Sequence, residues 1–298
     1  MKKPVFRGAA TALVTPMHPN GILDLETLKK LVLRQVESGI DALVPCGTTG
    51  ECAVLSAPER LAVIETVVSA AEGRVPVIAG AGSNDTVKML DFCRDAEKAG
   101  ADALLLVTPY YNKCTENGLI THFLRAADAV SIPIILYHVP SRTGVRMGLH
   151  AREVLSRHPN IAGIKEAAPD LTLVSETADA CGDALPVYSG NDDLTLPVMS
   201  LGGIGVISVT SNLFPREMHW LTSLMLDGKP KEALQLHRTL FPLMRELFCE
   251  VNPVPVKRAM EWIGLAAGPC RLPLGHLDDI HAKKLRSLVE TLKNSSEP

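Results

Sequence analysis

The stretch Ile161-Ala162-Gly163-Ile164-Lys165-Glu166-Ala167 is an apolar run that ends abruptly at a lysine. The run predicts a buried strand in which Ile161, Gly163 and Lys165 share one face, because side chains alternate along a strand. Removal from water disfavours the ammonium form of a lysine and leaves an amine able to attack carbonyl groups. The pattern therefore indicates a Schiff-base lysine, whereas an isolated lysine at a strand end more often simply reaches solvent.

Similar apolar runs recur along the whole chain and alternate with segments of helical spacing. They predict eight strands, at residues 9–14, 42–44, 75–79, 103–107, 132–137, 161–165, 185–188 and 204–209. Between them, apolar residues recur at intervals of three and four, which indicates amphipathic helices. Eight such units with no break in composition predict a closed parallel barrel ringed by helices, the (β/α)8 TIM barrel. An open doubly wound sheet is the alternative.

The strand pattern ends near Leu226, and three helical segments follow at residues 231–248, 256–263 and 278–292. We therefore predict a barrel domain at residues 1–226 and a helical C-terminal extension at 227–298. The extension is expected to cover the outside of the barrel or to make subunit contacts.

Composition excludes several classes of protein. The 298 residues are 46% hydrophobic and carry a formal net charge of -3, so no broad basic field is available to bind nucleic acid. Seven cysteines without a CxxC pair, and nine histidines without HExxH, predict neither a catalytic metal nor a disulfide framework. No apolar run approaches the ~18 residues that cross a bilayer. We expect a soluble cytoplasmic protein.

Several candidate side chains follow the predicted strands, where the working residues of such barrels lie. Tyr137 ends the fifth strand on its inward face, where a phenol could transfer protons, or where it could simply be a core tyrosine with a bonded hydroxyl. Thr48 and Thr49 lie in the glycine-flanked turn at 46–51, whose amides and hydroxyls could bind a small carboxylate. An ordinary connecting turn is the plainer interpretation of that segment.

Two further loops belong to the same predicted rim. Arg142 lies in the turn at 140–144 and could bind a carboxylate with two parallel hydrogen bonds, although a solvated surface arginine is the default. Tyr110 and Tyr111 follow the fourth strand, and packing is expected to account for at least one of them. The acidic segment at 189–193 is interpreted as a cap for the following helix rather than as a metal site.

Together these segments resemble one family, the dihydrodipicolinate synthases, now called 4-hydroxy-tetrahydrodipicolinate synthases. The family belongs to the pyruvate-dependent class I aldolases, which include N-acetylneuraminate lyase. The resemblance spans most of the chain, and it rests on the motifs ALVTP (12–16), GTTGE (47–51), TPYYNK (108–113), ILY (135–137), VPSRTG (139–144), GIKEA (163–167), SGNDD (189–193), GGIGVISVTSN (202–212) and NPVPVK (252–257).

The resemblance implies roles for the residues that carry the chemistry. Lys165 would form the imine with pyruvate, and the pyruvate carboxylate would lie near Thr48 and Thr49. Tyr137, Thr48 and Tyr111 would form a proton relay, with Tyr111 reaching in from a neighbouring subunit.

It also implies how the second substrate and the quaternary structure fit this site. Arg142 would bind the carboxylate of L-aspartate 4-semialdehyde, and Gly190 and Ile207 would line the pocket. The enzyme would be a homotetramer, a dimer of dimers, and would need no cofactor. Two alternatives remain: a related aldolase or lyase that acts on a sugar acid such as N-acetylneuraminate or 2-keto-3-deoxygluconate, and a pyruvate-binding homologue without catalysis.

The chain departs from the family pattern at two residues that adjoin the site. His138 stands where asparagine is more frequent and Cys114 where proline is common, so the rate or the pH response could differ.

A third departure concerns regulation by lysine. Ala57, Arg60 and Lys88 replace the histidines and glutamate of the allosteric pocket of lysine-inhibited members, while Asn84 remains. Because Lys88 would repel the effector's ammonium group, lysine feedback is expected to be weak or absent.

Overall fold

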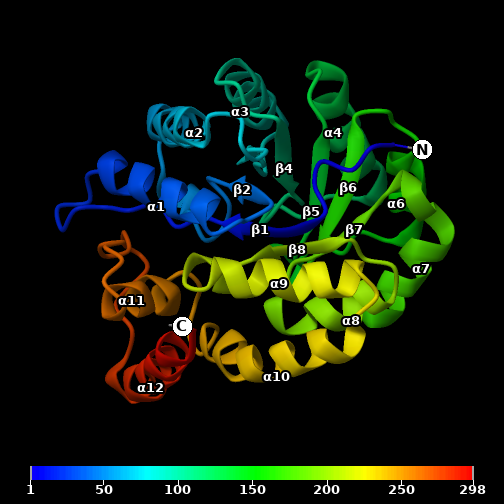
Figure 1. Cartoon of the computed structure of the whole chain (residues 1–298). Coiled ribbons are helices and arrows are strands. Elements are labelled where there is room, and N and C mark those ends of the chain that lie inside the picture. The colour runs from blue at the N-terminus through cyan, green and yellow to red at the C-terminus, as the bar shows by residue number, and fades with distance from the viewer. Residues whose placement is uncertain (1, 297–298) are drawn as a thin grey trace.

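Eight parallel strands form one barrel in residues 2–296, the part of the chain that the computed structural model describes (Figure 1). The strands pair in the order β2-β1-β8-β7-β6-β5-β4-β3, and a parallel bridge between Leu43 and Val77 brings β2 to β3 and closes the ring. The predicted (β/α)8 TIM barrel is confirmed. Each strand overlaps a predicted segment: β1 Gly8–Ala12, β2 Ala42–Val44, β3 Ile78–Gly80, β4 Ala103–Val107, β5 Ile134–His138, β6 Ile161–Glu166, β7 Val187–Ser189 and β8 Gly205–Ser208.

Helices surround the strands and then continue beyond them. Those that alternate with the strands are α1 Leu25–Glu37, α2 Ala57–Ala71, α3 Thr86–Lys98, α4 Glu116–Ala129, α5 Pro140–Thr143, α6 Leu149–Ser156, α7 Leu171–Cys181, α8 Thr195–Ser200 and α9 Pro215–Leu226. Three more follow: α10 Pro230–Glu246, α11 Val254–Trp262 and α12 Asp279–Ser296. α10 packs against α9, and α12 packs against both α10 and α11 (Figure 1). Within residues 2–296, no helix combines the length and the apolarity that crossing a bilayer requires.

Side-chain alternation divides the buried apolar residues into two layers. Inward-facing residues such as Ile135 and Tyr137 form a small cluster inside the barrel, while Leu136 and Ile164 belong to the larger cluster between strands and helices. Ile161 was predicted to share a face with Lys165, and this was wrong. It lies in the outer cluster, because the pairing of β5 with β6 shifts by one residue at this end of the strands.

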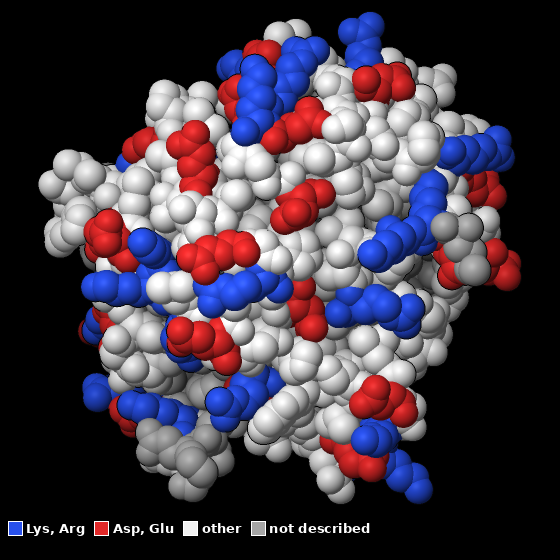
Figure 2. All heavy atoms as spheres, turned by 45° about the horizontal axis from the view of Figure 1, so that its top comes forward, with Lys and Arg blue, Asp and Glu red and all other residues white. Residues whose placement is uncertain are grey.

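Charges of both signs are interspersed on the face of the molecule shown in Figure 2, in agreement with the small net charge. Neither positive nor negative side chains predominate across that face. The expectation that nucleic acid is not a partner remains a prediction.

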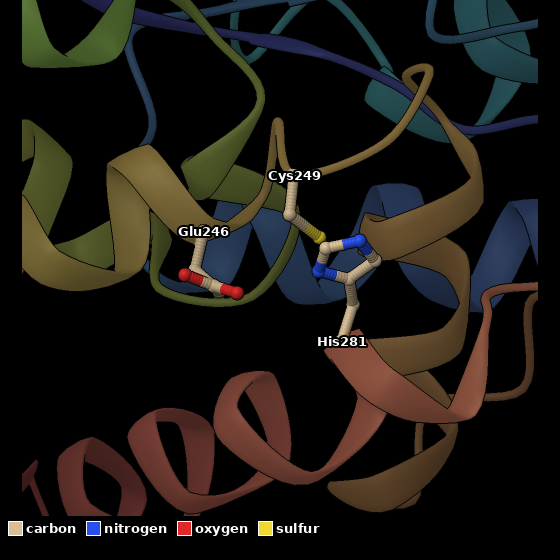
Figure 3. Close-up of side chains that lie close together, drawn as sticks. All are labelled: Glu246, Cys249 and His281. Atoms are coloured by element: carbon tan, nitrogen blue, oxygen red, sulfur yellow. The ribbon is translucent and has the colours of Figure 1, made fainter.

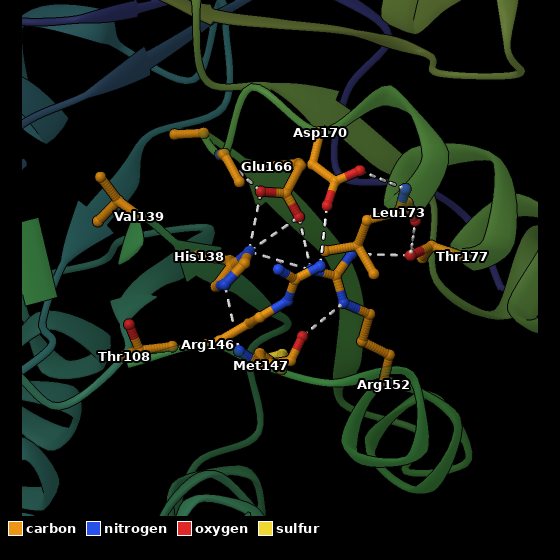
Figure 4. Close-up of polar contacts among 12 residues, drawn as sticks. Thr108, His138, Val139, Arg146, Met147, Arg152, Glu166, Asp170, Leu173 and Thr177 are labelled. Carbon is orange, nitrogen blue, oxygen red and sulfur yellow. Dashed lines mark hydrogen bonds and ion pairs between the residues drawn. The ribbon is translucent and has the colours of Figure 1, made fainter. Parts of the chain in front are cut away.

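A buried charge cluster lies at the carboxyl ends of β5 and β6, on the outer side of the barrel (Figure 4). The Glu166 carboxylate accepts a hydrogen bond from Arg152 at 2.6 Å and lies 2.8 Å from Nδ1 of His138. The backbone N–H of Met147 donates to Nε2 of His138 at 3.1 Å, so Nδ1 carries the ring proton and donates to the carboxylate. Arg152 also donates through Nη1 to the Thr177 hydroxyl at 2.7 Å and through Nε to the Met147 carbonyl at 3.3 Å. Every member of the cluster is therefore hydrogen-bonded.

Burial is the largest influence on the Glu166 carboxyl, and it raises the pKa of that group. The His138 hydrogen bond and the Arg152 charge together outweigh burial, so the pKa lies below its ordinary value. A carboxyl with a lowered pKa stabilises the fold at pH values above its unfolded pKa, and this contribution is lost as the pH falls through the folded pKa.

We predict that Arg152→Met lowers the free energy of unfolding by ~3 kcal/mol at pH 7, because it leaves a buried carboxylate without its cation. Urea unfolding followed by circular dichroism measures the effect, which should shrink as the pH falls through the lowered, folded-state pKa of Glu166, because the carboxyl is then protonated in both the folded and the unfolded state. Arg146→Met is the matched control, since its exposed ion pair with Asp170 should contribute nothing measurable. Equal losses in the two variants would contradict the prediction.

Candidate active site

Lys165 lies at the end of β6 and points into the barrel, with 6% of its surface exposed. It pairs in register with Tyr137 of β5, and its Nζ lies 4.3 Å from the centre of the Tyr137 ring. No residue between 2 and 296 forms a hydrogen bond or an ion pair with this Nζ. The amine is therefore buried beside a phenol and is not committed to a carboxylate.

The space beneath Lys165 is closed by an aromatic pair that the sequence analysis did not identify. Tyr188 stacks on Phe6 with ring centres 4.4 Å apart, and its hydroxyl donates to the Phe6 carbonyl at 2.8 Å. A Cβ at Gly163 would lie 2.9 Å from the Pro186 carbonyl and 3.1 Å from the Tyr188 ring, so glycine is needed for the ring to fit. Burial raises the pKa of the Tyr188 phenol. Tyr188 therefore keeps its proton and forms the floor of the site.

The turn after β2 presents the two threonines at the same end of the barrel. Its conformation requires positive φ values at two non-glycine residues, Cys46 at 55° and Glu51 at 56°. Thr49 is buried, and its hydroxyl accepts a hydrogen bond from Asn252 at 2.9 Å, whereas Thr48 is half-buried. A backbone with two positive φ values at non-glycine residues is strained, and the hydrogen bond from Asn252, in a distant segment of the chain, helps to hold it.

The C-terminal extension holds this turn through a second, charged contact. The Glu51 carboxylate lies 2.8 Å from Nζ of Lys257, and both side chains are buried. Lys257 also donates to the Thr15 carbonyl at 3.1 Å, and the backbone N–H of Arg271 donates to Glu51 at 2.9 Å. Glu51, Asn252 and Lys257 were not identified as site residues from the sequence, although all three lie in motifs quoted above.

Arg142 lies in the short helix α5, with its side chain exposed and its guanidinium unpaired within the described range 2–296. Burial is the main influence on the Cys52 thiol and raises its pKa, and the Arg142 charge acts in the opposite direction. Cys52 directly follows the turn that carries the threonines, and Arg142 lies near enough for its charge to act weakly on that thiol. Arg142 is therefore available at the rim to bind an anion.

Tyr111 is not brought to the site by its own chain. It is 91% exposed, with a φ of 71°, in the segment after β4. In the described part of the chain, no hydrogen bond joins it to Tyr137 or Thr48. The three members of the expected relay are therefore not connected within one subunit.

Gly190 follows β7, and Ile207 belongs to β8. The Gly190 N–H donates to the Glu166 carbonyl at 2.6 Å, and a Cβ there would come within 2.6 Å of the Ala167 side chain. Ile207 of β8 is buried in the inner cluster that also contains Tyr137. Glycine at 190 thus lets the backbone after β7 approach the residues that follow Lys165.

The interpretation of the segment at 189–193 as a helix cap was wrong. Asn191 forms no side-chain capping bond, and Asp192 turns instead toward the loop after β8. Its Oδ2 accepts hydrogen bonds from the N–H and hydroxyl groups of Thr210 at 2.8 and 2.7 Å. Asp192 therefore anchors one loop of the rim to the next.

His138 and Cys114, the two residues that depart from the family pattern, lie in different surroundings. His138 faces outward into the buried charge cluster, on the side of β5 opposite to Tyr137. Cys114 is half-buried just before α4. His138 can thus influence the site through the position of the strand, but its side chain does not face the interior of the barrel.

Taken together, the rim and the inner wall supply an uncommitted amine, a phenol, two hydroxyls beside backbone amides, and an exposed guanidinium. An amine of this kind forms an imine with a ketone, and a phenol can transfer the protons that imine formation requires. The guanidinium suits a second reactant that bears a carboxylate.

Known proteins resemble the chain over nearly its whole length. Residues 5–292 match the Dihydrodipicolinate synthetase family. A 4-hydroxy-tetrahydrodipicolinate synthase of Caldicellulosiruptor saccharolyticus is 48% identical over 286 residues, covering 96% of this chain and 97% of the relative. One from Thermoanaerobacter sp. is 45% identical over 287 residues, covering 96% of each.

Solved structures agree with these relatives. Dihydrodipicolinate synthase from Aquifex aeolicus superposes with a TM-score of 0.94 at 41% identity, covering 97% of this chain and 98% of the other. The enzyme from Cyanidioschyzon merolae with lysine bound gives a TM-score of 0.95 at 36% identity, covering 98% and 99%. Sequence and structure together confirm the resemblance drawn from the motifs: the chain belongs to the dihydrodipicolinate synthetase family.

Proposed function

We propose that this chain is a 4-hydroxy-tetrahydrodipicolinate synthase, a class I aldolase-type lyase that condenses pyruvate with L-aspartate 4-semialdehyde through a Schiff base on Lys165. The observation that carries the proposal is the position of Nζ, which is buried, unpaired within residues 2–296 and 4.3 Å from the centre of the Tyr137 ring. Family membership and the names of the relatives support it.

The first half of the reaction joins pyruvate to the enzyme. The amine of Lys165 adds to the ketone carbon, and loss of water gives the imine. Tyr137 supplies and removes the protons of these steps, with Thr48 connecting it to Tyr111 of another subunit. The pyruvate carboxylate binds the amides and hydroxyls around Thr48 and Thr49. Gly190 and Ile207 border the space that pyruvate occupies.

The second half adds the aldehyde. Loss of a proton from the methyl group turns the imine into an enamine, whose carbon attacks the aldehyde of the semialdehyde. Arg142 holds the carboxylate of that substrate at the mouth of the barrel. The substrate's own amine then replaces Lys165 at the imine carbon, which closes the ring and frees the enzyme. No cofactor enters any step.

The exposed position of Tyr111 supports a multimeric enzyme. A tyrosine that is 91% exposed, on a backbone with positive φ, occupies an unusual state for an isolated chain. We propose that it inserts into the site of a neighbouring subunit in a homotetramer built as a dimer of dimers.

All seven cysteines are free thiols, which supports the reducing cytoplasm as the location. We likewise propose the division into a barrel domain at residues 1–226 and an extension at 227–298. Hydrogen bonds from Asn252 and Lys257 join the extension to the barrel.

We predict that sodium borohydride traps pyruvate on Lys165 and on no other lysine, because only this amine is buried and unpaired beside a phenol. Peptide mass mapping of the reduced protein locates the adduct. Lys257 is the internal control, since it is buried but bound to Glu51 and should remain unmodified. Lys165→Arg should yield no adduct and lower kcat on the order of 1000-fold or more. An adduct on a different lysine would refute the assignment.

We predict that Arg142→Ala raises the KM for aspartate semialdehyde by about 10- to 100-fold, the effect of losing a charge-assisted hydrogen bond, and leaves the KM for pyruvate unchanged. Steady-state kinetics with each substrate varied in turn measures both values. Arg146→Ala is the matched control, since Arg146 is exposed in the same loop but is paired with Asp170. If the chain instead cleaved N-acetylneuraminate and left the semialdehyde unused, the synthase proposal would be wrong.

We predict that millimolar L-lysine does not inhibit the enzyme at saturating pyruvate. The Arg60 guanidinium donates to the Cys52 carbonyl and lies 4.3 Å from the centre of the Phe92 ring. Lys88 lies one turn before Phe92 on α3, so it adds a second positive charge at the positions that correspond to the allosteric pocket. Initial rates across a lysine titration give the result, and a clear half-inhibition point would contradict it. Lys88→Glu reverses one of these charges and should increase sensitivity to lysine if charge is the cause.

A further inference from the structure

Three side chains with metal-ligand chemistry meet where α10 ends and α12 begins (Figure 3). Glu246 is the last residue of α10, Cys249 follows one turn later, and His281 lies in the first turn of α12. One carboxylate oxygen, the sulfur and one ring nitrogen all lie within 4.8 Å of one another. In Figure 3 the sulfur points at the imidazole, and the carboxylate lies beside both.

We propose that Glu246, Cys249 and His281 bind a divalent transition-metal cation of the Zn²⁺ type, which joins α10 to α12. Thiolate, imidazole and carboxylate are the ligands that Zn²⁺ prefers. Metal–ligand bonds of ~2.0–2.3 Å in a tetrahedron place ligand atoms about 3.5 Å apart, so shifts of about 1 Å suffice. Cys249 and His281 are half-buried, which leaves a path for the ion and a fourth position for water.

The present partners of these groups are compatible with such an ion. Within residues 2–296 the His281 ring forms no hydrogen bond, so both of its nitrogens are available. The Glu246 carboxylate is paired with Lys284, whose side chain is 71% exposed and can turn to solvent when a metal takes the carboxylate. The ammonium group of Lys284 already lies beside the Glu246 carboxylate, which indicates that a positive charge is favoured at this position.

Binding must release one proton. Burial raises the pKa of the Cys249 thiol, and the charges of Glu246 and Glu250 on the same segment raise it further. From α12, His281 and Lys284 face the same cluster. The metal therefore exchanges with the thiol proton, so that M²⁺ and the thiol give the metal thiolate and H⁺. Because the thiol gives up its proton to the solvent, binding should tighten as the pH rises.

Cobalt provides the test, because Co²⁺ bound to a thiolate gives a charge-transfer band in the near ultraviolet. The untagged, metal-free full chain is titrated with Co²⁺ at pH 6, 7 and 8, with Zn²⁺ then added to displace it. The proposal requires one Co²⁺ per chain, a band that Zn²⁺ removes, and tighter binding at higher pH. Absence of the band at pH 8 would overturn it.

Matched variants assign the ligands. Cys249→Ser and His281→Ala should each abolish the band, whereas Cys270→Ser, at another half-buried cysteine of the extension, should keep it. Zn²⁺ should raise the melting temperature of the wild type and of Cys270→Ser but not of Cys249→Ser. Circular dichroism of each metal-free variant verifies folding, and Glu246→Gln provides a further ligand change if one variant fails to fold. A band that survives in Cys249→Ser would refute the site.

Discussion

The buried carboxylate of Glu166 is the constraint on which the site depends. It is held from three directions, by Arg152, by His138 and by the backbone N–H of Ala168 at 2.7 Å. Because successive side chains of a strand point to opposite faces, a carboxylate fixed on the outer face directs the preceding residue inward. The hydrogen bonds of the Glu166 carboxylate therefore determine where the amine of Lys165 lies, although Glu166 itself faces away from the interior of the barrel.

A second anchor comes from the far end of the chain. Lys257 and Asn252 bind the turn after β2 through Glu51 and Thr49, so residues beyond the barrel hold the part of the rim that carries the hydroxyls. The extension is therefore more than an outer cover. Removing one partner from a buried ion pair is costly, so the turn and the extension depend on each other for their conformations.

The sequence revealed the barrel and the two central residues because both depend on local patterns. Eight short apolar runs, alternating with segments of helical spacing, could be recognised one segment at a time, and Lys165 and Tyr137 each end such a run. The face of Ile161 was mispredicted, because a shift of register between two strands leaves no mark in either one alone. The partners of Asp192 and Glu51 come from other segments, the latter 206 residues away, and no local period reports such pairs. The predicted role of Tyr111 would require a neighbouring subunit, because its side chain is 91% exposed in the single chain.

The stacked rings of Phe6 and Tyr188 fill the interior of the barrel below Gly163, so the amine of Lys165 is closed off from the amino-terminal end of the strands. Both reactants must then enter, and the product leave, through a single mouth. Under the roles proposed for Lys165 and Arg142, the ketoacid would bond at the deep position and the aldehyde would lie above it. The proposal therefore implies an order of addition, with the ketoacid first and the aldehyde second.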